Sequence, residues 1–367
     1  MDFDISRRAQ NIRSYSAGEI IFEAGDRGGE MFLVLEGRVL IALQGAEIDR
    51  LETGDIFGEM ALVEERARSA RATADSDTRL LCIDRDQFAE LVKDSPNFGL
   101  KVMSVMSRRL RRFIDEEVRK QRLEEELRIG REIQKSLIPR SCPSLPGWSF
   151  AAAYQPAREV GGDFYDFVFL PDEPDKMQLV IADVTGKGVP AALFMATCRT
   201  TMRAESMRGL GPAETLREAN CVIALDTHYP LFLTALCARL QANSGIVTFA
   251  NGGHERPLWL HAASGKAQSV MSHDPLLGFT QDAVYGEHTI SLQTGDYLIF
   301  FTDGVTEARN DAASFYGDER LLALLEGRIW SSPDLLLEGI LESVAEFSGD
   351  STQADDLTLV IAQVTET

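Results

Sequence analysis

The chain has 367 residues, of which 44% are hydrophobic and 8% aromatic, and it carries a formal net charge of −20. This length exceeds one ordinary hydrophobic core and predicts two domains, and the composition is typical of globular domains rather than disordered chain. Residues 1–139 hold 23 basic and 27 acidic side chains, whereas residues 140–367 hold 14 and 30. Because acidic surfaces repel a phosphate backbone, this balance argues against nucleic acid as a partner.

The five cysteines include no Cys-x-x-Cys pair, so we expect free thiols in a reducing compartment rather than a zinc site or disulfide framework. The first residues lack the apolar core of a secretory signal. No apolar run approaches the ~18 residues needed to cross a bilayer. The sequence therefore predicts a cytoplasmic protein without a membrane partner.

Short apolar runs punctuated by glycine fill residues 20–83, and the runs 31–35 and 39–43 flank a hairpin-like break at Glu36-Gly37. This rhythm predicts a small antiparallel β-roll. From Pro96 to Leu137 apolar residues recur among mixed charges and no proline interrupts them, which predicts one long amphipathic helix. Its charges are expected to form a solvated face, and as a coiled coil it would join two copies in a homodimer.

A proline-rich segment, residues 139–147, ends this helix, and strand-like runs then alternate with helical stretches. The pattern predicts an α+β sandwich. The expected strands are 178–182, 235–240, 246–250, 297–301 and 357–364, and the expected helices are 190–208 and 212–225.

The segment Gly54-Asp-Ile-Phe-Gly-Glu-Met-Ala-Leu62 is followed by Arg68-Ser-Ala-Arg-Ala72. A backbone turn at Gly58 would present N–H groups to an anion, and Arg68 could add a charge-assisted bond to a phosphate. Glu59 could accept a hydrogen bond from a sugar hydroxyl. Taken alone, one glutamate and one arginine would by default form a surface ion pair.

This segment resembles the phosphate-binding cassette of cyclic-nucleotide-binding domains, whose pattern is Phe-Gly-Glu-x-Ala-Leu and then Arg-(Ser/Thr/Ala)-Ala. The resemblance covers residues 10–112 and implies that cAMP or cGMP is a regulatory ligand. It places Glu59 on the ribose 2′-hydroxyl. It also implies a cyclic-phosphate site made by Gly58, Ala61, Arg68, Ser69 and Ala70.

Aspartates stand at four strand ends in the second half of the chain: Asp163 with Asp166, then Asp183, then Asp303, and the pair Asp355-Asp356. A single aspartate in such a place is usually a turn or helix cap. Four such groups gathered together would repel one another and take up protons unless cations were bound. Hard divalent cations prefer oxygen ligands, so the pattern indicates a site for two metal ions that act on phosphate.

The motifs Val160-Gly-Gly-Asp-Phe-Tyr-Asp166, Ile181-Ala-Asp-Val-Thr-Gly-Lys-Gly188, Asn251-Gly-Gly-His254, Phe301-Thr-Asp-Gly-Val-Thr-Glu307 and Asp355-Asp-Leu-Thr358 occur in this order. Together they resemble the bacterial PPM-type serine/threonine phosphatases, and among these the sigma-regulator (SpoIIE/RsbU-like) branch. The resemblance runs from about Glu126 to Val364. It implies a β-sandwich flanked by helices and two Mn²⁺ or Mg²⁺ ions.

The same resemblance implies the role of each site residue. Asp183 would bridge both ions, with the Val184 carbonyl on one of them, and Asp303 and Asp355 would complete the metal shell. Asp163 would act through metal-bound water, and Asp356 is counted as a neighbouring metal residue. The catalytic pair would thus be Asp163 and Asp183.

Three positions leave alternatives open. Many PPM members have a histidine in the turn after the bridging aspartate, where this chain has Thr185-Gly-Lys-Gly. Arg158 is either a phosphate-binding residue or a surface arginine. His254 is either a loop residue or a catalytic one.

These features predict a cyclic-nucleotide-binding domain (1–112), a helical coiled-coil linker (113–139) and a PPM-type phosphatase domain (140–367). The expected substrate is a phosphorylated protein, by resemblance a STAS-type anti-sigma-factor antagonist, whose phosphoester is hydrolysed without a phosphoenzyme. Two alternatives remain: a nucleotide sensor with an inactive phosphatase-like half, and a phosphatase that cyclic nucleotide does not control.

Overall fold

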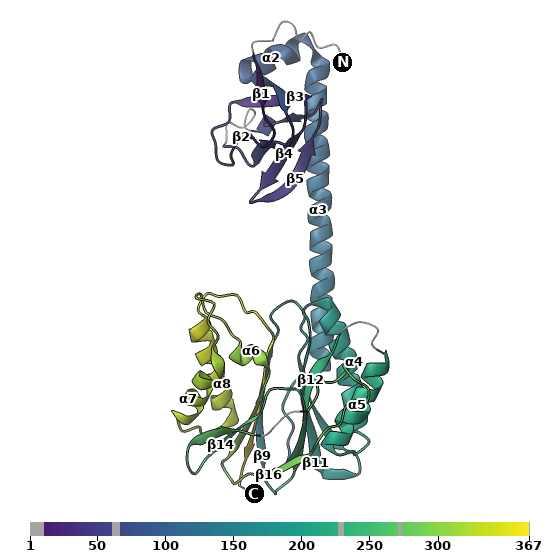
Figure 1. Ribbon diagram of the computed structural model, residues 1–367, viewed down its shortest axis with the longest axis vertical. Helices are drawn as coiled ribbons and strands as arrows, with labels where there is room; N and C mark the ends of the chain where they lie inside the picture. Colours follow the sequence, from purple (N-terminus) through teal and green to yellow (C-terminus); the bar gives the residue numbers. More distant parts are fainter. Residues whose placement is uncertain (1–10, 61–66, 227–230, 271–273, 367) are drawn as a thin grey trace. The chain divides into compact units, whose positions relative to one another are not determined.

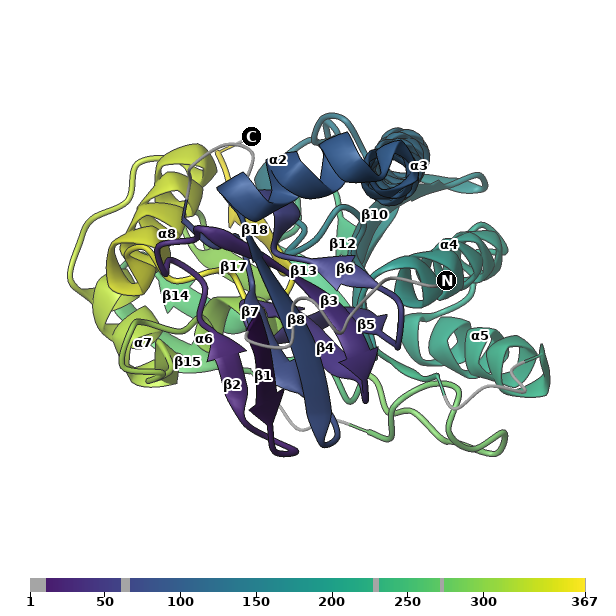
Figure 2. The same cartoon turned by 90° about the horizontal axis from the view of Figure 1, so that it is seen from above.

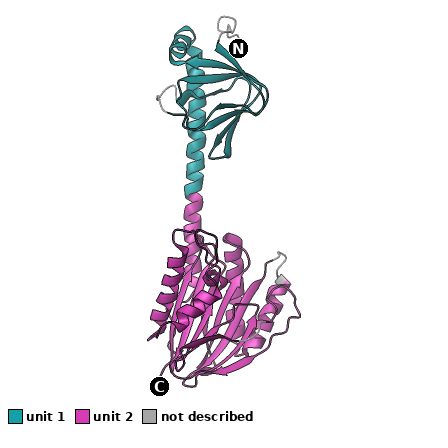
Figure 3. Cartoon of the chain, turned by 60° about the vertical axis from the view of Figure 1, so that its left-hand side comes forward, with its two compact units in different colours: residues 1–121 teal, residues 122–367 magenta. Residues whose placement is uncertain are grey.

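The computed structural model describes residues 11–60, 67–226, 231–270 and 274–366 (Figure 1). The chain forms two compact units, residues 1–121 and residues 122–367, which Figure 3 colours separately. Within the described ranges, no helix is long and apolar enough to cross a membrane.

Two antiparallel four-stranded sheets form the first unit, with strand orders β1-β8-β3-β6 and β2-β7-β4-β5. Alternate side chains of β3 serve two cores, because successive residues of a strand point to opposite faces. Phe32 and Val34 pack between the sheets, whereas Met31 and Leu33 face the helices that follow. The predicted β-roll is confirmed. Its strands are β1 (Ile12–Tyr15), β2 (Ile20–Phe22), β3 (Glu30–Glu36), β4 (Val39–Leu43), β5 (Ala46–Leu51), β6 (Ile56–Phe57), β7 (Arg71–Ala74) and β8 (Thr78–Asp84).

Two helices, α2 and α3, follow the roll in the described part of this unit. Helix α2 (Arg85–Asp94) begins with a capping box, in which Asp84 and Gln87 satisfy each other's backbone N–H groups. Helix α3 spans Pro96–Leu137, the bounds that the sequence predicts. Its first turns bury apolar side chains against the roll, whereas all side chains from 111 to 126 are exposed.

The second unit is a sandwich of two five-stranded antiparallel sheets with helices on both outer faces (Figure 2). Helices α4 (Val189–Ser206) and α5 (Pro212–Asp226) cover one sheet. Helices α6 (Asp303–Thr306), α7 (Gly317–Glu326) and α8 (Pro333–Ser348) cover the other. The first sheet is β10 (Phe164–Leu170), β11 (Glu173–Val184), β12 (Leu233–Gln241), β13 (Ile246–Gly252) and β16 (His288–Ser291), and the second is β15 (Lys266–Ser269), β14 (Leu258–His261), β17 (Tyr297–Phe301), β18 (Leu357–Val364) and β9 (Trp148–Gln155).

Three apolar layers hold the sandwich together, one between the sheets and one under each helical face. On β11, Leu179 and Ile181 point between the sheets, whereas Val180 and Ala182 point towards α4 and α5. Because both faces of the central strands are covered, these strands are continuous apolar runs rather than alternating ones. The predicted α+β sandwich is confirmed.

Candidate functional site

The four aspartate segments of the second unit meet at one end of the sandwich. Asp163 directly precedes β10, and the antiparallel register of β10 with β11 places Phe164 opposite Ala182, so that Asp163 lies beside Asp183. On the other sheet, Asp303 follows the end of β17, and Asp355 comes just before β18, whose first residues pair with that end. Sheet topology therefore gathers residues that are up to 192 positions apart in the sequence (355 − 163).

Asp163 is the most enclosed of these carboxylates, with 2% of its surface exposed. Its Oδ2 accepts hydrogen bonds from the hydroxyls of Thr302 and Thr358, both at 2.7 Å. Burial raises the pKa of Asp163 well above its usual range, and the neighbouring charges of Asp183 and Asp356 add to the effect. Two threonines of one sheet thus fix a carboxylate that the other sheet supplies.

The remaining carboxylates also act on one another. Burial, with the charge of Asp303, raises the pKa of Asp183 to about 7. Burial, with the charge of Asp355, raises the pKa of Asp303 to about 6. Such mutual destabilisation of the charged forms is what bound cations would relieve.

The donor set fits hard divalent cations, because it consists of carboxylate oxygens and a backbone carbonyl. Gly162 allows the carbonyl of Val184 to come close: a Cβ at Gly162 would stand 2.9 Å from that oxygen. In the described residues, no three acidic, histidine or cysteine side chains are arranged to hold an ion as they stand. Asp355 instead pairs with Lys187, Nζ to Oδ2 at 2.7 Å, so cation binding would require this carboxylate to exchange partners.

Asp356 binds the backbone of the loop before β10 rather than the centre of the cluster. One carboxylate oxygen accepts from the backbone N–H of Ala157 at 2.7 Å, and the other accepts from Gly162 at 2.5 Å. Burial raises the pKa of Asp356, and these hydrogen bonds offset part of that rise. The geometry therefore favours an anchoring role for Asp356 over the metal contact that the sequence suggests.

Asp166, although it belongs to the same motif, faces away from the cluster. It is buried and forms ion pairs with two arginines of α4, Arg199 at 2.9 Å and Arg203 at 2.8 Å. Asp166 thus ties β10 to α4 and is part of the scaffold.

Two of the three open positions, His254 and Arg158, differ in their surroundings. His254 is buried, and burial lowers its pKa to about 3, so that it stays neutral near pH 7. Its backbone is held by the side chain of Asn251, and its Nδ1 lies 2.8 Å from the hydroxyl of Thr234, which favours the loop role. Arg158 is exposed, and its Nη1 lies 3.8 Å from the point where a Cβ of Gly188 would stand, beside the turn that follows Asp183.

The nucleotide cassette of the first unit centres on Arg68. Its guanidinium lies 4.3 Å from the ring centroid of Phe22, and Nη1 donates to the carbonyl of Gly58 at 3.0 Å. Gly58 has φ +74°, a conformation that favours glycine, and a Cβ there would meet Nη1 at 2.6 Å. The Nε of Arg68 is buried and lacks a partner in the described part of the chain, which suits an anionic ligand.

The other residues predicted for the phosphate site differ in exposure. Ser69 is exposed and Ala70 is buried, whereas Ala61 lies outside the described residues.

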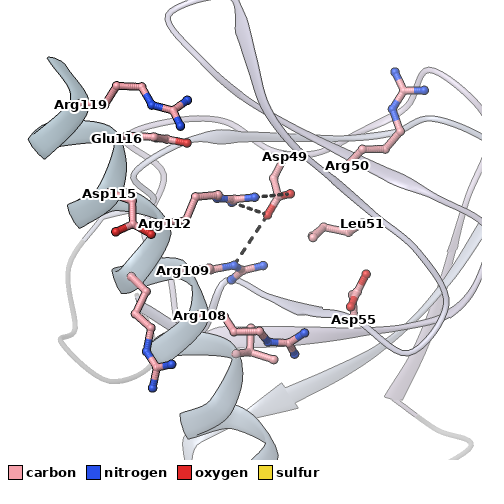
Figure 4. Close-up of a pocket in the computed structure, with 12 residues that line it drawn as sticks. Asp49, Arg50, Leu51, Asp55, Arg108, Arg109, Arg112, Asp115, Glu116 and Arg119 are labelled. Carbon is pink, nitrogen blue, oxygen red and sulfur yellow. Dashed lines mark hydrogen bonds and ion pairs between the residues drawn. The ribbon is translucent and has the colours of Figure 1, made fainter. Parts of the chain in front are cut away.

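Glu59 has a partner that the sequence reasoning missed. Its buried carboxylate accepts from Arg109 of α3, Nη1 to Oε1 at 2.7 Å, and Arg109 also donates to the carbonyl of Ile56. The charged run of α3 was expected to be solvated, but the pairing of Arg109 with a buried acid corrects this for one member. Arg109 also lines a hollow of about 620 Å³ between β5 and α3, where Arg109 and Arg112 face Asp49 (Figure 4).

The chain matches two family models. "Stage II sporulation protein E (SpoIIE)" matches residues 173–365, more than half of the chain, and "Cyclic nucleotide-binding domain" matches residues 12–95. The first match covers Asp183, Asp303 and Asp355 but begins after Asp163, and the second covers the Arg68 cassette.

Individual relatives and a solved structure are similar to more than half of the chain. Protein IcfG of Synechocystis is 29% identical over 282 residues, which are 70% of this chain but only 44% of that protein. Phosphoserine phosphatase RsbU of Bacillus subtilis is 28% identical over 241 residues, 66% of this chain and 70% of that one. The structure of the RsbU and RsbW domains of Rv1364c from Mycobacterium tuberculosis aligns with a TM-score of 0.54 and 27% identity, covering 62% of this chain and 63% of that one.

The family match over residues 173–365 covers most of the sandwich and three of the clustered aspartates. The chain therefore belongs to the stage II sporulation protein E family, and it carries a cyclic-nucleotide-binding domain followed in the sequence by a PPM-type serine phosphatase domain.

Proposed function

We propose that this chain is a metal-dependent protein serine/threonine phosphatase whose activity a cyclic nucleotide controls. The observation that carries the proposal is the convergence of Asp163, Asp183, Asp303 and Asp355 at one end of the sandwich. The match to the SpoIIE family and the similarity to a phosphoserine phosphatase support it.

In this proposal the chain's own residues hold two Mn²⁺ or Mg²⁺ ions and orient the phosphate. Asp183 would bridge the ions, and the Val184 carbonyl, Asp303 and Asp355 would complete the shell. Bound ions of this kind lower the pKa of water and neutralise phosphoryl charge. The threonines occupy Oδ2 of Asp163, and its side chain also contacts that of Asp183, so Asp163 would orient a water molecule through Oδ1 only once cations have changed this contact.

The phosphate of the substrate would enter beside the Gly186-Lys187-Gly188 turn. Arg158 lies next to that turn, and Lys187 would be released from Asp355 when this carboxylate binds a cation. Two positively charged side chains beside this turn, Arg158 and Lys187, suit a phosphorylated protein. We propose a STAS-type anti-sigma-factor antagonist as the substrate class.

Asp183→Asn tests the metal assignment. It keeps the shape of the side chain and removes the charge that would bridge two ions, so Mn²⁺-dependent hydrolysis of p-nitrophenyl phosphate and of a phosphoserine peptide should fall by several orders of magnitude. Asp172→Asn, in an exposed turn of the same unit, is the matched control and should keep full activity. Near-normal turnover by a folded Asp183→Asn protein would refute the assignment.

The regulatory part of the proposal rests on the Arg68 cassette and on the continuity of α3, which begins in the first unit and ends in the second. Exposed apolar side chains of α3, among them Leu110, Ile114 and Val118, support a homodimer formed along this helix. Activity with Mn²⁺, measured with and without cAMP and cGMP, separates a regulated phosphatase from an unregulated or an inactive one.

A further inference from the structure

The last turns of α3 hold a backbone segment that leads into the aspartate cluster. Gln134, with only 6% of its surface exposed, makes two hydrogen bonds to one residue, Gly161. Its Nε2 donates to the Gly161 carbonyl at 2.7 Å, and its Oε1 accepts from the Gly161 N–H at 3.0 Å. The side-chain amide therefore pairs with both polar groups of one residue, which fixes that residue in position and orientation.

A second residue of α3, one turn earlier, holds the adjoining part of the same segment. Arg131 donates to the carbonyl of Glu159 at 2.9 Å, and its guanidinium also pairs with the carboxylate of Glu159 at 3.2 Å. Arg131 and Gln134 are three residues apart and so lie on one face of the helix. This face of α3 is thereby fastened to residues 159–161.

Asp356 and Tyr154 also confine the segment. A Cβ at Gly161 would come within 2.3 Å of both the carboxylate of Asp356 and the hydroxyl of Tyr154. Asp356 accepts from the N–H of Gly162, the residue that lies against the Val184 carbonyl and precedes Asp163. A shift at Gly161 therefore passes along two peptide units to the carbonyl and the carboxylate of the cluster.

We propose that Gln134 is a positioning residue of the metal site, and that its amide sets the backbone of Gly161 and Gly162 for cation binding. This inference rests on the proposed phosphatase function. It also identifies the point at which a movement of α3 would reach the site. A residue that merely anchored the end of the helix would affect stability alone.

The experiment compares two variants of the full chain, Gln134→Met and Gln178→Met. Each replaces a buried amide of the second unit by an apolar side chain of similar length. Gln178 donates to the carbonyl of Leu210, outside the cluster, and so controls for the cost of losing a buried hydrogen bond. In the absence of metal, both variants should melt at a lower temperature than the wild-type protein.

Only Gln134→Met should weaken Mn²⁺ binding, by about tenfold or more in calorimetry, because residues that support metal ligands typically contribute this much to affinity. Its kcat for p-nitrophenyl phosphate at saturating Mn²⁺ should also fall, whereas Gln178→Met should keep both values. If Gln134→Met does not fold, Gln134→Glu serves instead. It keeps the acceptor for the Gly161 N–H and puts an oxygen where the donor was.

The possible failures differ. Wild-type Mn²⁺ affinity and kcat in a folded Gln134 variant, with an active wild-type protein, would overturn the positioning role alone. A wild-type chain that binds Mn²⁺ but hydrolyses no phosphoester would refute the proposed function, and the Mn²⁺ affinities of the variants would still decide the role of Gln134. Equal losses in the Gln134 and Gln178 variants would assign both effects to stability and overturn the inference.

Discussion

The charge state of Asp183 links pH to the stability of the metal-free protein. Its pKa of about 7 in the folded chain exceeds the ~3.9 of an unfolded aspartate, so the folded state binds more protons between these values. The contribution of Asp183 to stability is therefore fully present below about pH 4 and is lost as the pH rises from about 4 to 7, by up to ~1.4 kcal/mol per pH unit for one proton.

Asp183→Asn should remove this loss. We expect the free energy of unfolding of the variant, measured with urea in the presence of a chelator, to exceed that of the wild type by an amount that grows from pH 5 to pH 7. His254 contributes with the opposite sign, since its pKa is lowered, but it is present in both proteins and cancels in the difference. Parallel pH curves would contradict the expected effect.

Arg68 should govern nucleotide affinity through a single charged contact. A hydrogen bond to a charged group contributes about 1.5–3 kcal/mol, so Arg68→Ala should weaken binding of the cyclic nucleotide by about 10- to 150-fold. Arg71→Ala is the matched control, because Arg71 is exposed and pairs with Glu23 on the surface. Calorimetry that found equal affinities in the wild type and Arg68→Ala would exclude Arg68 from the phosphate site.

Insertions into α3 test whether the rotation of its second half relative to its first half matters for activity. Inserting two residues near Arg119, where all side chains are exposed, rotates the following part of the helix by ~200°, whereas inserting seven leaves a residual rotation of only ~20°. The two-residue insertion should change basal phosphatase activity or abolish the nucleotide response, because Arg131 and Gln134 would leave their register with the preceding turns.

The seven-residue insertion should preserve both properties. Activity with and without nucleotide, together with sedimentation to follow dimerisation, checks the two variants. An unchanged response in both would mean that α3 is a passive tether.

At the scale of the whole molecule, the two units should respond to different ligands. Each has its own apolar cores, and a ligand that binds only the folded state stabilises by RT ln(1 + [L]/Kd), about 2.7 kcal/mol at 100 times Kd. In scanning calorimetry we expect Mn²⁺ to raise the melting temperature of one transition and cyclic nucleotide that of another. A single transition that both ligands shift equally would show that the units unfold together.

Local pattern was enough to predict α3 and the strands β17 and β18, whose bounds match the expected ones. These elements are long or continuously apolar, so their periodicity is unambiguous. Strand β11 begins at Glu173 rather than at the expected Gln178, because its first residues are polar and give no apolar signal. The sequence also located the cassette at Arg68 and the four aspartate segments, since each has a recognisable motif.

Only the tertiary structure decided what each of those residues contacts. Neither the pairing of Glu59 with Arg109 nor that of Gln134 with Gly161 follows from local sequence, because the partners lie 50 and 27 positions apart. The same holds for Asp356, which is adjacent to Asp355 but turns to backbone N–H groups of a distant loop. The sequence by itself determined which chemical groups are present and which segments are helical or extended. Burial and cross-strand register decided their partners, because these depend on how the sheets and helices pack and not on the pattern within any one of them.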